Sequence, residues 1–100
     1  MKVMTLAAAA LAALPAIPAY AQDTASRNLA APCAICHGTD GRAVTKDMVA
    51  LAGLPQEHIV TQMKAFRDGK RPATVMHQIA KGYTDPQIDS LAAWFAAQKK

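Results

Sequence analysis

Three residues with reactive side chains stand together in the first half of the sequence, within the stretch CAICHG. Cys33 and Cys36 are the only 2 cysteines of the chain, and His37 follows Cys36 directly. Thiolates and imidazole rings bind metals, attack electrophiles and form covalent links, so this spacing allows more than one chemistry. The function of the chain depends on which chemistry needs two thiols and one ring so close together.

Four uses of this stretch compete. A disulfide between Cys33 and Cys36 would close a loop too small to stabilise a fold strongly. A thioredoxin-like redox pair needs a strand leading into the motif within a βαβ pattern, which the sequence lacks. A structural zinc site needs four ligands, whereas Cys33, Cys36 and His37 supply three and no second cluster follows. The fourth use is covalent attachment of haem, for which C-x-x-C-H is the recognised spacing.

Haem attachment explains the close spacing best, and we favour it over the other three uses. Two thiols add across the two vinyl groups on one edge of the porphyrin, and the adjoining imidazole is thereby placed beneath the iron as its proximal ligand. Small domains usually need a disulfide, a metal or a bound cofactor for stability, and a large apolar macrocycle would supply the missing core.

The first 21 residues have the features of a cleavable signal peptide. Lys2 gives a positive start, an apolar stretch follows, and Ala19-Tyr20-Ala21 fits the small-x-small pattern of a cleavage site. A membrane anchor is the alternative, because residues 3–21 approach the length of a membrane span, but two prolines weigh against it. We therefore expect a signal peptide over 1–21, export to the periplasm, and a mature monohaem domain over 22–100 without stable membrane insertion.

The mature chain is short and mildly basic. Its ten Lys and Arg against seven Asp and Glu give a net charge of +3, with the charges too scattered for a nucleic-acid binder. The sharpest local excess is Lys64, Arg67, Lys70 and Arg71. These cations either complement the end of a helix or steer an acidic partner toward an exposed haem edge.

The sequence predicts an all-α domain with three main helices, because no stretch alternates convincingly enough for a strand. The main helices are expected over 24–31, over 54–68 with Pro55 in its first position, and after Thr84, which forms a capping box with Gln87. Short helical turns are expected over 47–52 and 75–81. Apolar residues form one buried stripe on each of the two longer helices: Ile59, Met63 and Phe66, then Ile88, Leu91, Ala92 and Phe95.

An electron-carrying haem iron needs a second axial ligand, for which the mature chain offers five candidates: Met48, Met63, Met76, His58 and His77. We favour Met76, because it follows a loop long enough to wrap the macrocycle, and His77 is its main competitor. Met63 lies on a buried stripe and is expected in the core, His58 is expected in solvent, and Met48 stands too near the cysteines to cross easily to the opposite face.

The order of these segments resembles the small class I cytochromes c. The stretches APCAICHGTDGRAV, LAGLP and MKAFRDGKRPATVMHQIAKGYTDPQIDSLAAWFA match the family's attachment site, middle helix, methionine loop and terminal helix, over residues 24–97. The resemblance implies helices and loops wrapped around one covalently attached haem c, with thioethers at Cys33 and Cys36 and axial ligands His37 and Met76. It implies an electron carrier and not an enzyme, with a crossing of the first and last helices.

Within the family, GKRPATVMHQIAKGYTD is most similar to the cytochrome subunit of flavocytochrome c sulfide dehydrogenase. This finer resemblance implies redox protein partners, among them a flavoprotein that oxidises sulfide. The alternatives are a free soluble shuttle in a respiratory chain, or a ligand-binding or catalytic haem domain with an open iron site. Many members place a proline before the middle helix, whose carbonyl orients the proximal histidine. This chain has none over residues 33–54, so the resemblance does not identify the acceptor for His37.

Overall fold

The structure is a computed structural model that describes residues 3–4, 12–13 and 20–100. Most of the predicted signal peptide, residues 1–2, 5–11 and 14–19, lies outside the described residues, so the signal peptide and the 22–100 boundary stay predictions. Among the described helices, none combines the length and apolar character that a membrane span requires.

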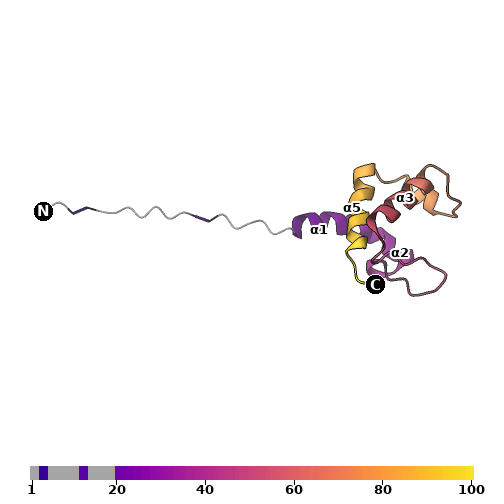
Figure 1. The fold of residues 1–100 in the computed structure, drawn as a ribbon, viewed down its shortest axis with the longest axis horizontal. Coiled ribbons are helices and arrows are strands. Elements are labelled where there is room, and N and C mark those ends of the chain that lie inside the picture. The colour runs from indigo at the N-terminus through magenta and orange to yellow at the C-terminus, as the bar shows by residue number, and fades with distance from the viewer. Residues whose placement is uncertain (1–2, 5–11, 14–19) are drawn as a thin grey trace.

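The described residues 20–100 form helices joined by loops and contain no strand (Figure 1). The elements in chain order are α1 (Tyr20–Ala30), η1 (Ala31–Cys33), α2 (Ala34–His37), η2 (Thr39–Gly41), α3 (Gln56–Arg67), α4 (Met76–Ala80) and α5 (Asp85–Ala96). The predicted all-α class and its three main helices, α1, α3 and α5, are therefore confirmed.

Two helix boundaries differ from the prediction. The first helix begins at Tyr20 and not at residue 24, and its path continues through η1 and α2 to His37. α1 itself ends at Ala30, one residue before the predicted end at 31, and Pro32 follows in the first turn of η1, where its missing N–H needs no helical partner. The middle helix begins at Gln56, with Pro55 as the extended residue before it (ψ 136°) and not as its first helical residue.

The segment 47–52 does not form the expected helical turn. Its backbone groups are used elsewhere: the N–H groups of Leu51 and Ala52 both donate to the carbonyl of Gly41, at 2.8 and 3.1 Å. A chain whose amides bond across a loop cannot also close i to i−4 helical bonds. The short helix predicted over 75–81 is confirmed as α4.

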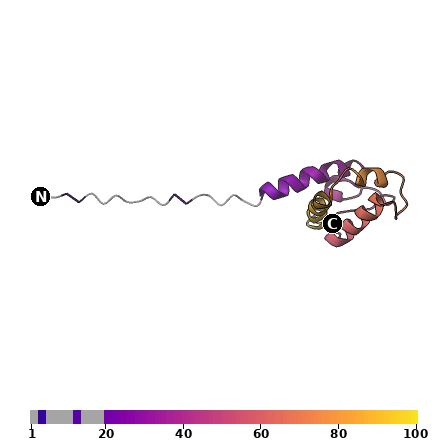
Figure 2. The same ribbon diagram turned by 90° about the horizontal axis from the view of Figure 1, so that it is seen from above.

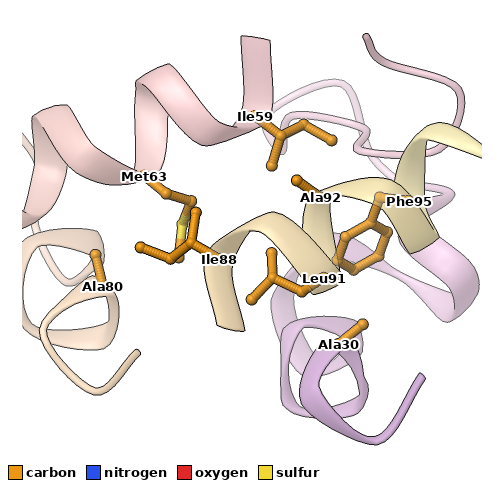
Figure 3. Close-up of a cluster of buried hydrophobic side chains, with 8 residues drawn as sticks. All are labelled: Ala30, Ile59, Met63, Ala80, Ile88, Leu91, Ala92 and Phe95. Carbon is orange, nitrogen blue, oxygen red and sulfur yellow. The ribbon is translucent and has the colours of Figure 1, made fainter. Parts of the chain in front are cut away.

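The hydrophobic core gathers around α5, which packs against α1 on one side and α3 on the other. Figure 3 shows Ile88 near Met63 and Ala80 at one end, and Leu91 and Phe95 near Ala30 at the other. The predicted core residues of α5 and both Ile59 and Met63 are buried, whereas Phe66 is only half-buried. Ala30 belongs to the same cluster as Phe95, as the predicted crossing of first and last helices requires.

Hydrogen bonds at both ends of α5 fix it in place. At its start Thr84 and Gln87 form the predicted capping box, with Thr84 N–H donating to Gln87 Oε1 at 2.9 Å and Gln87 N–H to Thr84 Oγ1 at 3.3 Å. The Tyr83 hydroxyl donates to the Leu29 carbonyl of α1 at 3.2 Å, and burial raises the pKa of this phenol. At the other end Gly53 N–H donates to the Phe95 carbonyl at 2.9 Å. Tyr83 therefore ties the start of α5 to α1.

Two long loops, 42–55 and 68–75, extend on the side of the molecule opposite the start of α1 (Figures 1 and 2). The first follows the CxxCH stretch and the second leads into Met76. The fold thus presents both sequence-predicted site segments on one side, while the helix crossing forms the other.

Candidate cofactor site

The CxxCH stretch lies on helical backbone, which places its three reactive residues on one face. Cys33 ends η1, and Cys36 and His37 end α2. Residues three and four apart on a helix share one face, so Cys33 faces the same way as Cys36 and His37. Cys33 is half-buried and Cys36 is exposed.

Both cysteines are free thiols in the structure, and no disulfide joins them. Burial raises the pKa of the Cys33 thiol, an effect only partly offset by a backbone hydrogen bond. A reactive redox cysteine has the opposite property, a lowered pKa that favours the thiolate. Cys33 therefore lacks the electrostatic environment of a thioredoxin-like nucleophile, and the described residues contain no strand leading into it.

The His37 ring is held by the main chain of the following loop. Its Nδ1 lies 2.7 Å from the carbonyl oxygen of Val49. A carbonyl only accepts hydrogen bonds, so Nδ1 must carry the proton and donate it. The neutral ring then has its lone pair on Nε2, which is the form that binds a metal ion.

The Val49 carbonyl is the acceptor that the sequence did not identify. The resemblance to class I cytochromes c implies a proline carbonyl in this role, whereas this chain, without proline over residues 33–54, supplies the carbonyl of Val49. Every residue type has a backbone carbonyl, so no signal in the residue types could have located it. The hydrogen bond fixes the ring from the side opposite the metal-binding nitrogen.

A compact turn after α2 brings Val49 back to His37. Gly38 (φ +86°) starts the turn, and Gly41 N–H donates to its carbonyl at 2.9 Å. Asp40 is the one described non-glycine residue with positive φ (+55°), a conformation that Asp tolerates better than most residues. The Gly41 carbonyl in turn receives the amides of residues 51 and 52, which closes the loop.

The structure separates the five candidates for a second axial ligand. Met63 is a core residue, 6% exposed, as predicted, and His58 is exposed on α3. Met48 is 38% exposed and adjoins Val49, on the loop that already serves the His37 ring. Met76 and His77 both begin α4 and are half-buried, and of these two Met76 packs against the hydrophobic core while His77 lines a surface concavity. The assignment of Met76 stays a prediction.

Exposed apolar side chains flank both site segments. They are Ile35 (88% exposed) between the cysteines, Val44 and Val49 in the following loop, and Val75 and Ile79 on either side of Met76. Apolar surface on a small monomer commonly marks a binding surface.

The buried core is small, and no buried side-chain nitrogen or oxygen in the described residues lacks a partner. The side chains of the two site segments fit a large apolar macrocycle that holds a metal. They supply two thiols, an imidazole with a free Nε2, a thioether and apolar surroundings.

The zinc alternative finds no ligand set in the part of the chain that the structure describes. No three His, Cys, Asp or Glu side chains gather there closely enough to hold a metal ion. A structural zinc site requires four such ligands.

Comparisons with known proteins find several relatives of this chain. No protein-family profile matches the chain. It is 39% identical over 85 residues to the cytochrome subunit of sulfide dehydrogenase from Chlorobaculum tepidum, covering 83% of this chain and 76% of that protein. It is 34% identical over 70 residues to cytochrome c-554(548) from Halomonas halodenitrificans, covering 67% and 84%.

A third relative is longer than this chain. Cytochrome c4 from Pseudomonas aeruginosa is 36% identical over 70 residues, which cover 70% of this chain but 35% of that protein. The chain thus spans about a third of the length of this relative.

Proposed function

The chain belongs to the class I c-type cytochromes, and we propose that it carries one haem c, tethered through Cys33 and Cys36 and ligated by His37 and Met76. Its relatives are named as cytochromes, and its function is that of an electron carrier and not of an enzyme. The observation that carries the proposal is the hydrogen bond from His37 Nδ1 to Val49, which leaves Nε2 available for iron in the same CxxCH stretch as two free thiols.

Bound haem would supply a reversible one-electron exchange between ferric and ferrous iron. The residues of the chain then have positioning roles only. Cys33 and Cys36 hold one edge of the macrocycle, the Val49 carbonyl keeps the His37 ring in its ligating tautomer, and Met76 provides a soft thioether that favours ferrous iron. No side chain at this site needs to give up or accept a proton during electron transfer.

The cellular setting follows from the attachment chemistry and from the first residues. We place the signal peptide at residues 1–21 and the working domain at 22–100, in the periplasm. The bacterial origin of the relatives supports this placement. The described helices contain no membrane-spanning candidate.

The electron donor that we favour is a flavoprotein of the sulfide dehydrogenase type. The similarity to the cytochrome subunit of sulfide dehydrogenase supports it, since that match covers most of both chains. The next acceptor would be a further cytochrome or an oxidase. A free shuttle in a respiratory chain would use the same site with other partners.

The test is to express residues 1–100 in a host equipped for covalent haem attachment and to characterise the purified protein. We expect a red protein that keeps its colour after acid-acetone treatment, is reduced and oxidised reversibly, and does not take up carbon monoxide in the ferrous state. A colourless product would contradict haem attachment. Ready uptake of carbon monoxide would contradict six-coordinate iron and favour the open-site alternative.

A further inference from the structure

A shallow concavity lies where α3 ends and α4 packs against it. Its volume is about 360 Å³, and its wall includes Phe66 and Arg67 of α3, Arg71 of the following loop, His77 of α4, and Lys81 directly after α4. His77 directly follows Met76, the proposed iron ligand. The concavity therefore adjoins the segment that carries the proposed iron ligand.

One arginine of this wall is neutralised by its neighbours. Arg67 Nη1 donates to Asp85 Oδ1 at 2.5 Å, and its Nε lies 3.8 Å from Asp68 Oδ1. The hydrogen bond from Arg67 is the main reason why the pKa of Asp85 is lowered. With two carboxylates beside it, Arg67 adds little net positive charge to the concavity.

The other arginine keeps its charge and is held in place. The Arg71 guanidinium stacks over the Phe66 ring at 4.7 Å from the centroid, and its Nη1 donates to the side-chain oxygen of Gln62. Both contacts are with uncharged groups, so they orient the guanidinium without neutralising it. Its backbone N–H also donates to the Ala65 carbonyl at 3.2 Å.

Lys81 extends the positive surface across the concavity. Lys81 is the C-terminal cap of α4 and keeps helical backbone, so it lies one turn after His77 and on the same side. Among the ion pairs between described residues, none involves Lys81, Lys70 or Arg71. The helix dipole accounts for Lys64 and Arg67 in the last turn of α3, but Arg71 and Lys81 lie beyond that helix.

The start of α3 has the opposite charge. A second concavity there, of about 400 Å³, is lined by Glu57 and Asp89 together with uncharged residues. Positive and negative surfaces thus occupy opposite ends of one helix of 12 residues. A charge separation of this kind orients an approaching charged molecule before contact.

We infer that the concavity at the end of α3 is the docking surface for an acidic redox protein, whose carboxylates meet Arg71 and Lys81. This inference rests on the proposed function as an electron carrier. A small anion should bind this concavity more weakly than an acidic protein surface does, because exposed cations around an open depression bind a single ion poorly. A protein surface engages several of these cations at once and is steered by their summed field.

The experiment titrates the haem-loaded protein with poly-L-glutamate, which serves as the acidic probe. Binding is measured at low salt from the NMR shifts of the backbone amides. We expect shifts concentrated at residues 66–73 and 77–81 that disappear as salt is added. The double variant R71Q/K81Q should weaken binding by about tenfold or more. The control R27Q/K100Q removes the same amount of charge elsewhere on the chain and should change the affinity for poly-L-glutamate by about twofold at most.

The inference would be overturned if both double variants bound poly-L-glutamate equally weakly, or if the amide shifts were spread evenly over all Lys and Arg residues. It would also be overturned if sodium sulfate at matched charge gave the same amide shifts, because that result would indicate a small-anion site. Electron exchange with a neutral ferrocene mediator separates this inference from the proposed function. If R71Q/K81Q binds the probe like the wild type while both exchange electrons normally, the docking surface is wrong and the electron carrier stands. If the wild type exchanges no electrons, the proposed function itself is wrong.

Discussion

Nδ1 of His37 and the carbonyl oxygen of Val49 are 2.7 Å apart, although 12 positions separate the two residues in the chain. The contact depends on the closed turn over 38–41 and on the loop that returns from it. A hydrogen bond of this kind raises the basicity of a ligating imidazole and fixes its orientation. The electronic properties of the iron should therefore be sensitive to a loop that contains no ligand.

The first prediction concerns the stiffness of that loop at Val49. Val49→Gly keeps the carbonyl but makes the backbone around it more flexible. The hydrogen bond to His37 should therefore be formed in a smaller fraction of the molecules. A less basic imidazole stabilises ferric iron less, and the reduction potential should rise. Val44→Gly is the matched control, because Val44 is 90% exposed in the same loop. Potentiometric titration of the three proteins measures the effect, and an equal rise in both variants would contradict it.

The second prediction separates two methionines. Met76→Ala should leave haem attached but open one axial position, so that the ferrous protein takes up carbon monoxide. Met63→Ala should leave the visible spectrum unchanged and lower the free energy of unfolding by about 2–5 kcal/mol, because Met63 is a core residue. His77→Ala serves as the control for the competing ligand and should behave like the wild type. Carbon monoxide uptake by the Met63 or His77 variant instead would show that the ligand is assigned to the wrong residue.

The features that local chemistry determines were predicted from the sequence. The capping box at Thr84 and Gln87 begins α5 as expected, and helical periodicity places Ile59 and Met63 in the core. Each of these signals lies within a few neighbouring residues. Physical reasoning from the sequence is reliable at this range because the interacting groups are close in the chain.

The features that depend on contacts distant in the chain were not predicted. The segment 47–52 has apolar residues consistent with a helical turn, but its amides bond to Gly41. The acceptor for His37 is a backbone carbonyl, which no residue type encodes. Pro32 permits helical backbone on both sides because it falls in the first turn of η1, a detail of register that the sequence leaves undetermined.

The third prediction tests the turn that positions Val49. Gly41 has φ +79°, and a Cβ there would lie 2.8 Å from the Ala52 nitrogen and 2.9 Å from Phe95 Cδ1. Gly41→Ala should therefore combine backbone strain with a clash against α5, at a cost of about 1–3 kcal/mol for the strain alone. Gly69→Ala is a matched control, since Gly69 also has positive φ (+72°) but would meet nothing within 4 Å. Its cost should be limited to about 1–2 kcal/mol.

Denaturant unfolding of the haem-loaded variants measures this difference. The Gly41 variant should also lose protection of the amides of residues 51 and 52 from hydrogen exchange, because both donate to the Gly41 carbonyl. Equal stability of the two variants would mean that the contact with Phe95 relaxes without cost.

The last prediction concerns pH and the ion pair between α3 and α5. The pKa of Asp85 is lowered from its ordinary value of 3.8, chiefly by the hydrogen bond from Arg67 and further by the attraction of that charge. A group with a lowered folded-state pKa stabilises the fold above its unfolded pKa and loses this contribution as the pH falls through the folded value. Asp85→Asn should therefore reduce stability at neutral pH but not at a pH well below 3.8.

Thermal unfolding of wild type and variant across this pH range measures the effect. Asp89→Asn is a suitable control, because Asp89 lies on the same helix and outside the ion pairs of the described residues. Both side chains of the Arg67–Asp85 pair reach solvent, so the difference should shrink as salt is added. A loss for Asp85→Asn that persists unchanged in strong acid, where Asp85 is uncharged, would show that the stabilising effect does not come from its charge.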